Sequence, residues 1–281
     1  MPLAKRPSMA DRRGAIVSLL VGQEQSSIAD LADRFAVSQM TIRRDLERLA
    51  AEGRVTIGRG EARLSYYSGI EPKYAAKQRV NAALKAQIAR YAADNFVADG
   101  DVILLEGGTT VTAMAHGLDA KTGLTVITNG MYTVNELVRL LPDATIISTG
   151  GILRDLSFTY VGPQAEEMLA NLHANTFFMS ASGFTMKQGL TDPNPLEVQI
   201  RKQMIKCAER VVVLLDSTKF GLISTITTAR TSELDVVITD EGAPPSDVKQ
   251  LRSAGVDVRV VPGAGGASAN TAQGLPAAPA A

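Results

Sequence analysis

The chain has 281 residues, of which 45% are hydrophobic and 21% are charged, a balance typical of a globular protein with about two domains. No apolar run is long enough to span a bilayer, and the charged N-terminus lacks the apolar core of a secretory signal. The single cysteine, Cys207, excludes intramolecular disulfides, and the histidines, His116 and His173, lack partners at metal-ligand spacing. We therefore expect a cytoplasmic protein without membrane contact, metal or cofactor.

Charge is unevenly distributed along the chain, although the formal net charge is zero. Residues 1–65 contain 11 Lys and Arg against 8 Asp and Glu, a net charge of +3. The remaining residues contain 18 against 21, a net charge of −3. A basic segment on a slightly acidic body is compatible with DNA binding by that segment, but three charges alone do not establish it.

Composition and pattern divide the chain into five segments. Residues 1–10 and the Gly-, Ala- and Pro-rich residues 262–281 are expected to be disordered. Residues 11–64 have a compact helical pattern, and residues 65–76 form a linker in which glycine and proline interrupt regular structure. Residues 77–261 are expected to form a larger second domain.

Short β-branched runs alternate with helix-length segments throughout the larger domain. The runs lie at residues 102–105, 125–127, 145–147, 176–179, 211–215, 236–238 and 256–258. Apolar runs of this length, separated by helices, are typical of parallel strands in a sheet that is covered on both faces. The sequence therefore predicts a doubly wound, mainly parallel α/β fold for this domain.

Three helices are expected in residues 11–64. The first runs from about Met9 to Val21, and the second begins at Ser27, which can cap the helix through its hydroxyl. After a short break, Ser38 begins a third helix that extends to about Ala50. The apolar residues of the third helix follow one another at offsets of four and three: Ile42, Leu46 and Leu49. This spacing predicts one buried face.

The opposite face of the third helix is polar and carries arginines. It presents Met40, Thr41, Arg44, Glu47 and Arg48, with Arg43 on its flank. Two helices joined by a tight turn, the second with an arginine-bearing face, indicate a helix-turn-helix that binds DNA. Residues 53–64 follow as a β-hairpin with Arg59 at its tip, which is typical of a wing. The alternative is that these arginines simply solvate an exposed helix.

A specific spacing strengthens the DNA-binding interpretation. The chain reads Arg12-x3-Ile16-x3-Leu20-x17-Ser38-x2-Thr41-Ile42-Arg43-Arg44-Asp45-Leu46. This string resembles the signature of the DeoR family of bacterial transcriptional regulators. The resemblance implies that Thr41, Arg43 and Arg44 face DNA and that Asp45 braces the helix. The predicted DNA-binding residues are Ser38, Gln39, Met40, Thr41, Arg43, Arg44, Arg48 and Arg59.

Polar and glycine-rich corners follow several predicted strands. Open α/β sheets bind ligands at the carboxyl ends of their strands, and glycine-rich backbone offers donors to anions. Lys219, after the strand at 211–215, can supply a positive charge to a phosphate, or it can pair with Asp216 on the surface. The predicted effector-binding residues are Gly107, Gly108, Thr109, Thr110, Thr128, Asn129, Gly150, Gly151 and Lys219. They predict a site for a phosphate or sugar.

The larger domain also resembles the DeoR-type sensor domain, over about residues 75–260. The matching motifs are Gly107-Gly108-Thr109-Thr110, Thr128-Asn129, Gly150-Gly151, Gly162-Pro163, Gly189-Leu190-Thr191 and Asp216-Ser217-Thr218-Lys219-Phe220-Gly221. Glu106, Asn175 and the polar loop 180–182 depart from the family pattern. The resemblance implies a fold similar to ribose-5-phosphate isomerase and the CoA transferases.

The function expected from both resemblances is a repressor of a carbohydrate or related catabolic operon. Its partners would be operator DNA and a small phosphorylated metabolite, and its two-fold reading of DNA would require a homodimer or homotetramer. One alternative is a sugar-phosphate isomerase with a DNA-binding appendage, but residues 180–184 carry no carboxylate that can act as a base. Glu106 and Asp216 remain as possible bases. A second alternative is an architectural DNA binder without a ligand, which would not need the glycine-rich corners.

Overall fold

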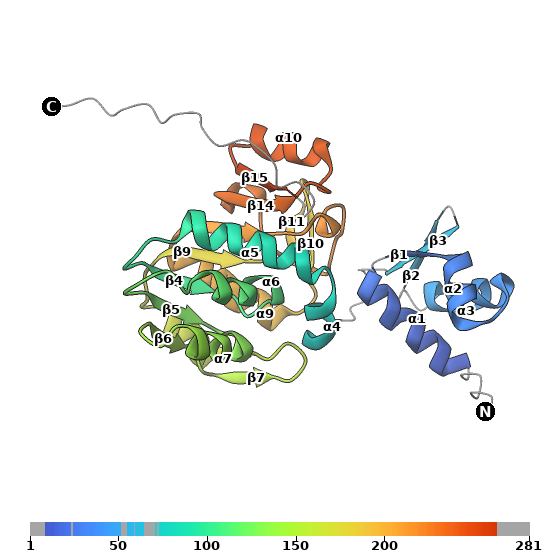
Figure 1. Ribbon diagram of the computed structural model, residues 1–281, viewed down its shortest axis with the longest axis horizontal. Helices are drawn as coiled ribbons and strands as arrows, with labels where there is room; N and C mark the ends of the chain where they lie inside the picture. The colour runs from blue at the N-terminus through green and yellow to red at the C-terminus, as the bar shows by residue number, and fades with distance from the viewer. Residues whose placement is uncertain are drawn as a thin grey trace.

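The computed structural model describes residues 9–23, 25–51, 55–58, 60–64, 71 and 73–262. The described residues up to 64 contribute an N-terminal unit, and residues 74–262 contribute a C-terminal domain (Figure 1). The elements of the N-terminal unit are α1 (Met9–Gln23), β1 (Gln25–Ser27), α2 (Ile28–Phe35), α3 (Gln39–Ala51), β2 (Val55–Gly58) and β3 (Glu61–Leu64). The three helices and the hairpin agree with the sequence-based expectation, whereas β1 was not predicted.

The N-terminal unit is held together by one apolar cluster to which every helix contributes. Its fully buried members include Ile16, Leu20, Ile28, Leu31, Ile42, Leu46, Leu49, Val55 and Ala62. Ser27 caps α2, because its hydroxyl accepts a hydrogen bond from the Asp30 N–H at 3.0 Å. Strand β1 pairs with β3, so the hairpin β2–β3 becomes a three-stranded sheet in the order β1-β3-β2.

The C-terminal domain is built on a seven-stranded parallel sheet. Its strands are β4 (Val102–Leu105), β5 (Thr125–Thr128), β6 (Thr145–Ser148), β9 (Ala174–Met179), β12 (Ala208–Leu214), β14 (Val236–Asp240) and β15 (Asp257–Val261). The strand order is β15-β14-β12-β9-β4-β5-β6, and every neighbouring pair is parallel. The chain runs outward from β4 in one direction and from β9 in the other. The boundary between β4 and β9 is therefore the topological switch point, where open α/β sheets bind ligands.

Helices cover both faces of this sheet, which confirms the doubly wound fold. They are α5 (Ala82–Phe96), α6 (Thr109–Thr112), α7 (Met131–Leu140), α8 (Pro163–Leu169), α9 (Pro195–Lys206) and α10 (Pro245–Ser253). One apolar layer contains Ile88 of α5 and Leu137 of α7, and the other contains Leu169 of α8 and Met204 of α9. Within each buried strand, successive residues face opposite layers, as Leu104 and Leu105 do.

The sequence did not predict several elements of the C-terminal domain. Strands β7 (Ile152–Arg154) and β8 (Thr159–Val161) form an antiparallel hairpin. Strands β10 (Gly183–Thr185), β11 (Gly189–Asp192) and β13 (Ile226–Ala229) form a small antiparallel sheet. The helix α4 (Tyr74–Arg79) begins inside the range expected to be a linker, because the Tyr74 side chain is buried there. Among the described residues, no helix is long and apolar enough to cross a membrane.

Candidate DNA-binding and effector sites

The helix α3 has the cap that its sequence predicts. The Ser38 hydroxyl accepts a hydrogen bond from the Thr41 N–H at 3.2 Å and lies 2.9 Å from the Thr41 hydroxyl. These bonds satisfy part of the otherwise unpaired helix N-terminus and fix the direction in which α3 leaves the turn. Ser38 and Thr41 are therefore engaged in positioning the first turn of the helix, where recognition helices contact bases.

The polar face of α3 is exposed, as its periodicity predicts. The exposed side chains are Gln39, Met40, Arg43, Arg44, Glu47 and Arg48. On the buried side, Asp45 pairs with Arg12 of α1, with 2.6 Å between Nε and Oδ2 and both side chains less than 10% exposed. Asp45 thus anchors α3 to α1 while the arginines face outward. This contact agrees with the bracing role that the family resemblance implies.

Strands β2 and β3 form the predicted hairpin beside α3. The pair Gly58 and Glu61 closes it, and Gly60 has a φ of +85°, a conformation that glycine adopts without strain. Arg59, the residue predicted at the tip, lies outside the described residues. Helix-turn-helix and hairpin together form a winged helix, in which the wing can contact the DNA backbone or minor groove next to the recognition helix.

The corner after β4 lies directly at the switch point. We call residues Gly107–Thr110 the effector corner. A Cβ on Gly107 would lie 2.5 Å from Thr159 Cγ2 and 2.8 Å from Gly130 Cα, so glycine is required here for close packing. Helix α6, which starts in this corner, has only four residues before it tightens into a 3₁₀ turn at Ala113–Gly117. A helix of this length has only a weak dipole, so the backbone N–H groups are the main donors that the corner offers.

Thr128 and Asn129 are fully buried and bond to backbone. The Asn129 Oδ1 accepts from the Gly107 N–H at 3.0 Å, and its amide donates to the Tyr160 carbonyl at 3.3 Å. The Thr128 hydroxyl accepts from the Gly130 N–H at 3.0 Å. These two residues hold the effector corner against its neighbours, which is a supporting role for the predicted effector residues.

Gly150, Gly151 and Lys219 lie on opposite sides of the effector corner. The glycines follow β6, and Lys219 ends a short 3₁₀ helix that follows β12. Neighbouring strands are about 4.8 Å apart, so the ends of β6 and β12 are separated by roughly 19 Å across four spacings. One phosphate cannot contact both ends. In strand order the two ends are equally distant from the corner: β9 lies between β12 and β4, and β5 lies between β4 and β6.

A buried charge network that the sequence did not predict occupies the switch point. Arg201 of α9 makes ion pairs with Glu106, which follows β4, and with Asp192 of β11, where its Nη1 is 2.6 Å from Oδ2. The Ser180 N–H, which follows β9, donates to Glu106 Oε2 at 2.9 Å. Thr228 Oγ1 donates to Asp192 Oδ2 at 2.7 Å. The network therefore joins both halves of the sheet beneath the effector corner.

Burial and charge shift the pKa values of these carboxyls in different directions. Burial raises the pKa of Glu106, although Arg201 and the Ser180 N–H act against it. Burial also opposes ionisation of Glu197, but Arg201 and the hydroxyl of Thr159 outweigh it and lower its pKa. Both carboxyls lie on the α9 side of the effector corner. A group of unlike carboxyls and buried arginines is suited to recognise a polar ligand.

Asp216 and Lys219 are electrostatically coupled. Burial opposes ionisation of Asp216, but Lys219, the Thr218 hydroxyl and Lys85 together lower its pKa. Asn81, at the start of α5, donates to Asp216 Oδ1 at 3.3 Å. The coupling supports the alternative in which Lys219 pairs with Asp216.

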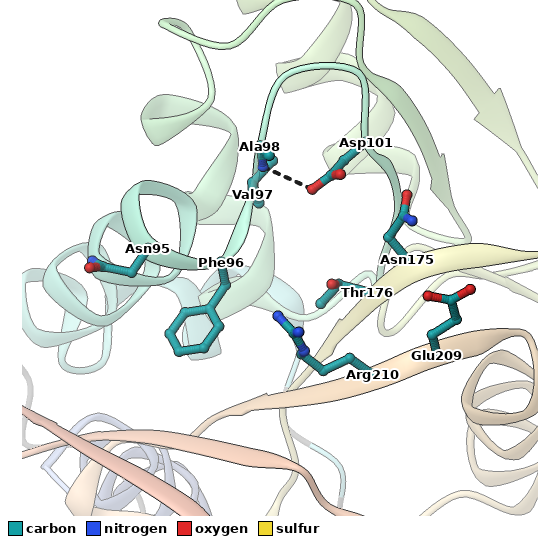
Figure 2. Close-up of a pocket in the computed structure, with 9 residues that line it drawn as sticks. All are labelled: Asn95, Phe96, Val97, Ala98, Asp101, Asn175, Thr176, Glu209 and Arg210. Carbon is teal, nitrogen blue, oxygen red and sulfur yellow. Dashed lines mark hydrogen bonds between the residues drawn. The ribbon is translucent and has the colours of Figure 1, made fainter. Parts of the chain in front are cut away.

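A pocket of about 520 Å³ lies at the other, amino-terminal edge of the sheet (Figure 2). Asp101, Asn175 and Arg210 line it from the starts of β4, β9 and β12. Asp101 accepts the Ala98 N–H at 2.8 Å, and Asn175 accepts the Val102 N–H at 2.8 Å. Because these side chains brace strand starts and lie away from the switch point, we place the effector site at the carboxyl edge instead.

The sequence offers one signal for part of this buried charge network, namely two charged residues at helical spacing on α9. Glu197 and Arg201 are four residues apart on α9, beside the buried Ile200 and Met204. A charged pair at this spacing usually lies on a solvated face, so the sequence alone favours exposure. Burial of the pair depends on Glu106 and Asp192, which are distant in sequence.

Comparison with known proteins identifies both parts of the chain. Residues 12–65 match the DeoR-like helix-turn-helix domain, and residues 80–241 match the DeoR C terminal sensor domain. The chain is 32% identical to the putative aga operon transcriptional repressor of Escherichia coli O157:H7 over 254 residues, 90% of this chain and 94% of that protein. It is 34% identical to the transcriptional regulator GolR of Listeria innocua over 250 residues, 89% and 98% of the two chains.

Two further similarities widen the comparison. The L-fucose operon activator of Haemophilus influenzae is 31% identical over 222 residues, 79% of this chain and 88% of that protein. Among solved structures, ribose 5-phosphate isomerase A of Methanocaldococcus jannaschii is similar with a TM-score of 0.37 and 19% identity, covering 50% of this chain and 55% of that chain.

A winged helix followed by a doubly wound sensor domain defines a DNA-binding transcriptional regulator. The protein belongs to the DeoR family.

Proposed function

We propose that the protein represses a carbohydrate or related catabolic operon in the cytoplasm and that a phosphorylated sugar, polyol or similar metabolite controls it. The observation that carries the proposal is the switch point between β4 and β9, where the effector corner lies beside the buried Glu106–Arg201 pair. The relative named as an aga operon repressor supports repression. The relative named as an L-fucose operon activator supports activation as the second candidate.

In this proposal the exposed face of α3 enters the major groove of the operator. Arg43 and Arg44 are suited to guanine edges or phosphates through the planar guanidinium fork, and Arg48 is suited to the backbone. The contacts are completed by Ser38, Gln39, Met40, Thr41 and the wing residue Arg59. Because one winged helix reads one half-site, we propose that a homodimer or homotetramer binds the full operator.

The effector's phosphate is proposed to bind at the effector corner. Backbone donors of Gly108, Thr109 and Thr110 and the ammonium group of Lys219 would supply its contacts. A metabolite that binds two arrangements of the protein unequally then shifts the affinity for the operator. The ligand would act by this difference, since equal binding to both arrangements changes nothing.

The proposal is tested on an operator fragment selected from a random DNA pool by the wild-type protein. Fragment binding is measured with and without a panel of sugar and polyol phosphates. Lys219→Ala is expected to keep its affinity for the fragment and to lose more than about tenfold in affinity for the active phosphate, the loss of a charged hydrogen-bond partner. Lys187→Ala, a change at an exposed lysine, is the control. A response of Lys219→Ala at the wild-type concentration contradicts the assignment of Lys219.

Catalysis is the other class of function to be weighed. Both candidate bases are occupied within the protein: Glu106 by Arg201 and Ser180, and Asp216 by Thr218 and Asn81. The curated relatives are transcriptional regulators. We therefore propose binding without turnover at this site. Conversion of any sugar phosphate by the purified protein at a rate abolished by Glu106→Gln would contradict this.

A further inference from the structure

Glu71 lies in the segment between the N-terminal unit and the C-terminal domain, and its carboxylate contacts Arg154 of strand β7. This carboxylate accepts hydrogen bonds from two nitrogens of Arg154. The distances are 2.7 Å from Nη2 to Oε2 and 3.5 Å from Nη1 to Oε1. Lys77 of α4 lies 3.5 Å from the same carboxylate. Glu71 and Arg154 are only 10% and 14% exposed. A two-point guanidinium contact of this kind is also the way in which arginine binds ligand oxygens.

Arg154 also contacts residues that adjoin the effector corner. Arg154 Nη1 donates to Glu197 Oε1 at 2.6 Å, and Ser157 Oγ donates to that oxygen at 2.7 Å. Thr159 also donates to Glu197 Oε1, and its methyl group lies against Gly107. The cluster of Arg154, Glu197 and Thr159 is therefore contiguous with the effector corner.

Three buried polar atoms of Glu197 and Arg201 have no hydrogen-bond partner within the described part of the chain: Glu197 Oε2, Arg201 Nε and Arg201 Nη1. Arg201 Nη1 has the Asp192 carboxylate as its ion-pair partner, which leaves Glu197 Oε2, an acceptor, and Arg201 Nε, a donor. The two residues lie on successive turns of α9, and each influences the ionisation of the other. Buried polar groups are normally paired, so this pair calls for a further group. A hydroxyl matches it, because a hydroxyl donates one hydrogen bond and accepts others.

We propose that Arg154 and Glu197 form a second effector subsite, which binds the hydroxyl-bearing part of the metabolite, and that Glu71 occupies the Arg154 contact until the metabolite arrives. This inference rests on the proposed function and names the class of effector: a phosphorylated compound whose carbon chain also carries hydroxyl groups. The phosphate binds at the effector corner, while Arg154 donates to a ligand oxygen and Glu197 accepts a hydrogen bond from a ligand hydroxyl. Carboxylates repel a second phosphate here, which favours hydroxyls at this end.

Competition for Arg154 would connect the ligand to the DNA-binding part. Loss of the Glu71 contact leaves α4 held by Tyr74, whose N–H donates to the Leu156 carbonyl at 3.0 Å. The Tyr74 ring stacks on Tyr132 at 4.6 Å and meets Phe158 edge-on at 6.5 Å. The chain before Tyr74 would then lose its ion pair with Arg154, while Glu71 could keep its contact with Lys77 of α4. Effector binding thus changes the attachment of the segment that leads to the N-terminal unit.

The experiment measures binding to the full-length protein by calorimetry. The probes are inorganic phosphate, glycerol 3-phosphate, D-ribose 5-phosphate and D-glucitol 6-phosphate. We expect at least one hydroxylated phosphate to bind more than about tenfold more tightly than inorganic phosphate, as one charged hydrogen bond provides. Glu71→Gln should strengthen that binding by about five- to tenfold, because the competing carboxylate is removed. Its affinity for inorganic phosphate should stay at the wild-type value.

Two further variants separate the subsite from a general effect. Glu197→Gln should weaken the hydroxylated phosphate by about tenfold and leave inorganic phosphate unchanged. Asp257→Asn is the matched control, because Asp257 receives Arg259 at 2.8 Å through two nitrogens on β15, at the far end of the sheet. If Glu197→Gln does not fold, Glu71→Gln still decides, since Glu71 lies outside the helices and strands of the C-terminal domain.

Hydrogen exchange reports the linker independently of affinity. The amides of residues 74–80 should exchange faster in Glu71→Gln than in wild type, and faster in wild type when the tightest hydroxylated phosphate is added. The subsite is overturned if no hydroxylated phosphate exceeds inorganic phosphate, or if Glu71→Gln leaves their affinity ratio unchanged. Inorganic phosphate binding that depends on Lys219 tests the effector corner separately, so the two proposals can fail independently.

Discussion

The two functional regions of this regulator place their charges in opposite ways. On the N-terminal unit, Arg43 and Arg44 are exposed on one helix, and the buried Arg12–Asp45 pair only positions that helix. At the switch point of the C-terminal domain, Arg201 and Glu106 are themselves buried. DNA presents an extended row of phosphates that a projecting surface can reach. A small metabolite is recognised by a few enclosed and oriented polar groups.

The buried pair in the N-terminal unit should be the most costly contact to break. Asp45→Ala leaves the Arg12 guanidinium buried without its carboxylate and is expected to lower the stability of this unit by about 3–5 kcal/mol. The measurement is native-state hydrogen exchange of the α3 amides. Glu47→Ala, at an exposed position of the same helix, is the control. Unchanged protection of α3 in Asp45→Ala would show that the pair does not hold the helix.

The apolar face of α3 should come next. Ile42→Ala and Leu46→Ala each remove a fully buried side chain and are expected to cost about 2–5 kcal/mol through lost packing and a cavity. DNA binding should fail with the fold of the unit. Met40→Ala serves as the control, because Met40 is 60% exposed and should change stability by less than about 0.5 kcal/mol. Wild-type melting of either core variant would mean that the helical register is wrong.

The exposed face should show the reverse separation of effects. Arg44→Ala is expected to weaken binding of the selected operator fragment by about 1–3 kcal/mol, while the free energy of unfolding hardly changes. Titration by fluorescence anisotropy at fixed salt measures the affinity. Arg34→Ala removes an exposed arginine from α2 instead and should have a smaller effect. Equal losses in the two variants would reduce the role of Arg44 to general electrostatic attraction.

The same comparison explains what the sequence could predict. Helix α3 follows from local rules, since its cap at Ser38 and its apolar spacing from Ile42 to Leu49 are all within one element. The strands of the parallel sheet are likewise visible as short apolar runs. Strand β1 has only three residues, Gln25–Ser27, and exists because β3 supplies its hydrogen-bond partners. No local pattern encodes such a strand.

The effector region depends on contacts between distant segments, and sequence analysis named the residues of the corner and Glu106 but not the ion pairs around them. Gly107 was recognisable from the turn after an apolar strand. Arg154 and Glu71 are 83 positions apart, and Arg201 and Glu106 are 95 apart. A charged side chain is ordinarily exposed, so burial of these four follows only from the mutual neutralisation that the fold brings about. The sequence named both Lys219 and Gly150 as effector-binding residues, and the strand order places them too far apart for one phosphate to contact both.

The smallest expected effect is on the pH dependence of stability, and it tests whether Lys219 contacts Asp216 in solution. Burial opposes ionisation of Asp216, but Lys219 leads the groups that lower its pKa below the ordinary value. A carboxyl with a lowered folded-state pKa contributes stability above its unfolded pKa of about 3.9, and this contribution disappears as the pH falls through the folded value.

In Lys219→Ala the pKa of Asp216 should return toward its ordinary value. Denaturant unfolding between about pH 5 and pH 3 should therefore show a shallower loss of stability than wild type, whereas Lys187→Ala should retain the wild-type slope. Identical slopes in all three proteins would mean that Lys219 does not stabilise the Asp216 carboxylate, and its charge would then be available for a phosphate.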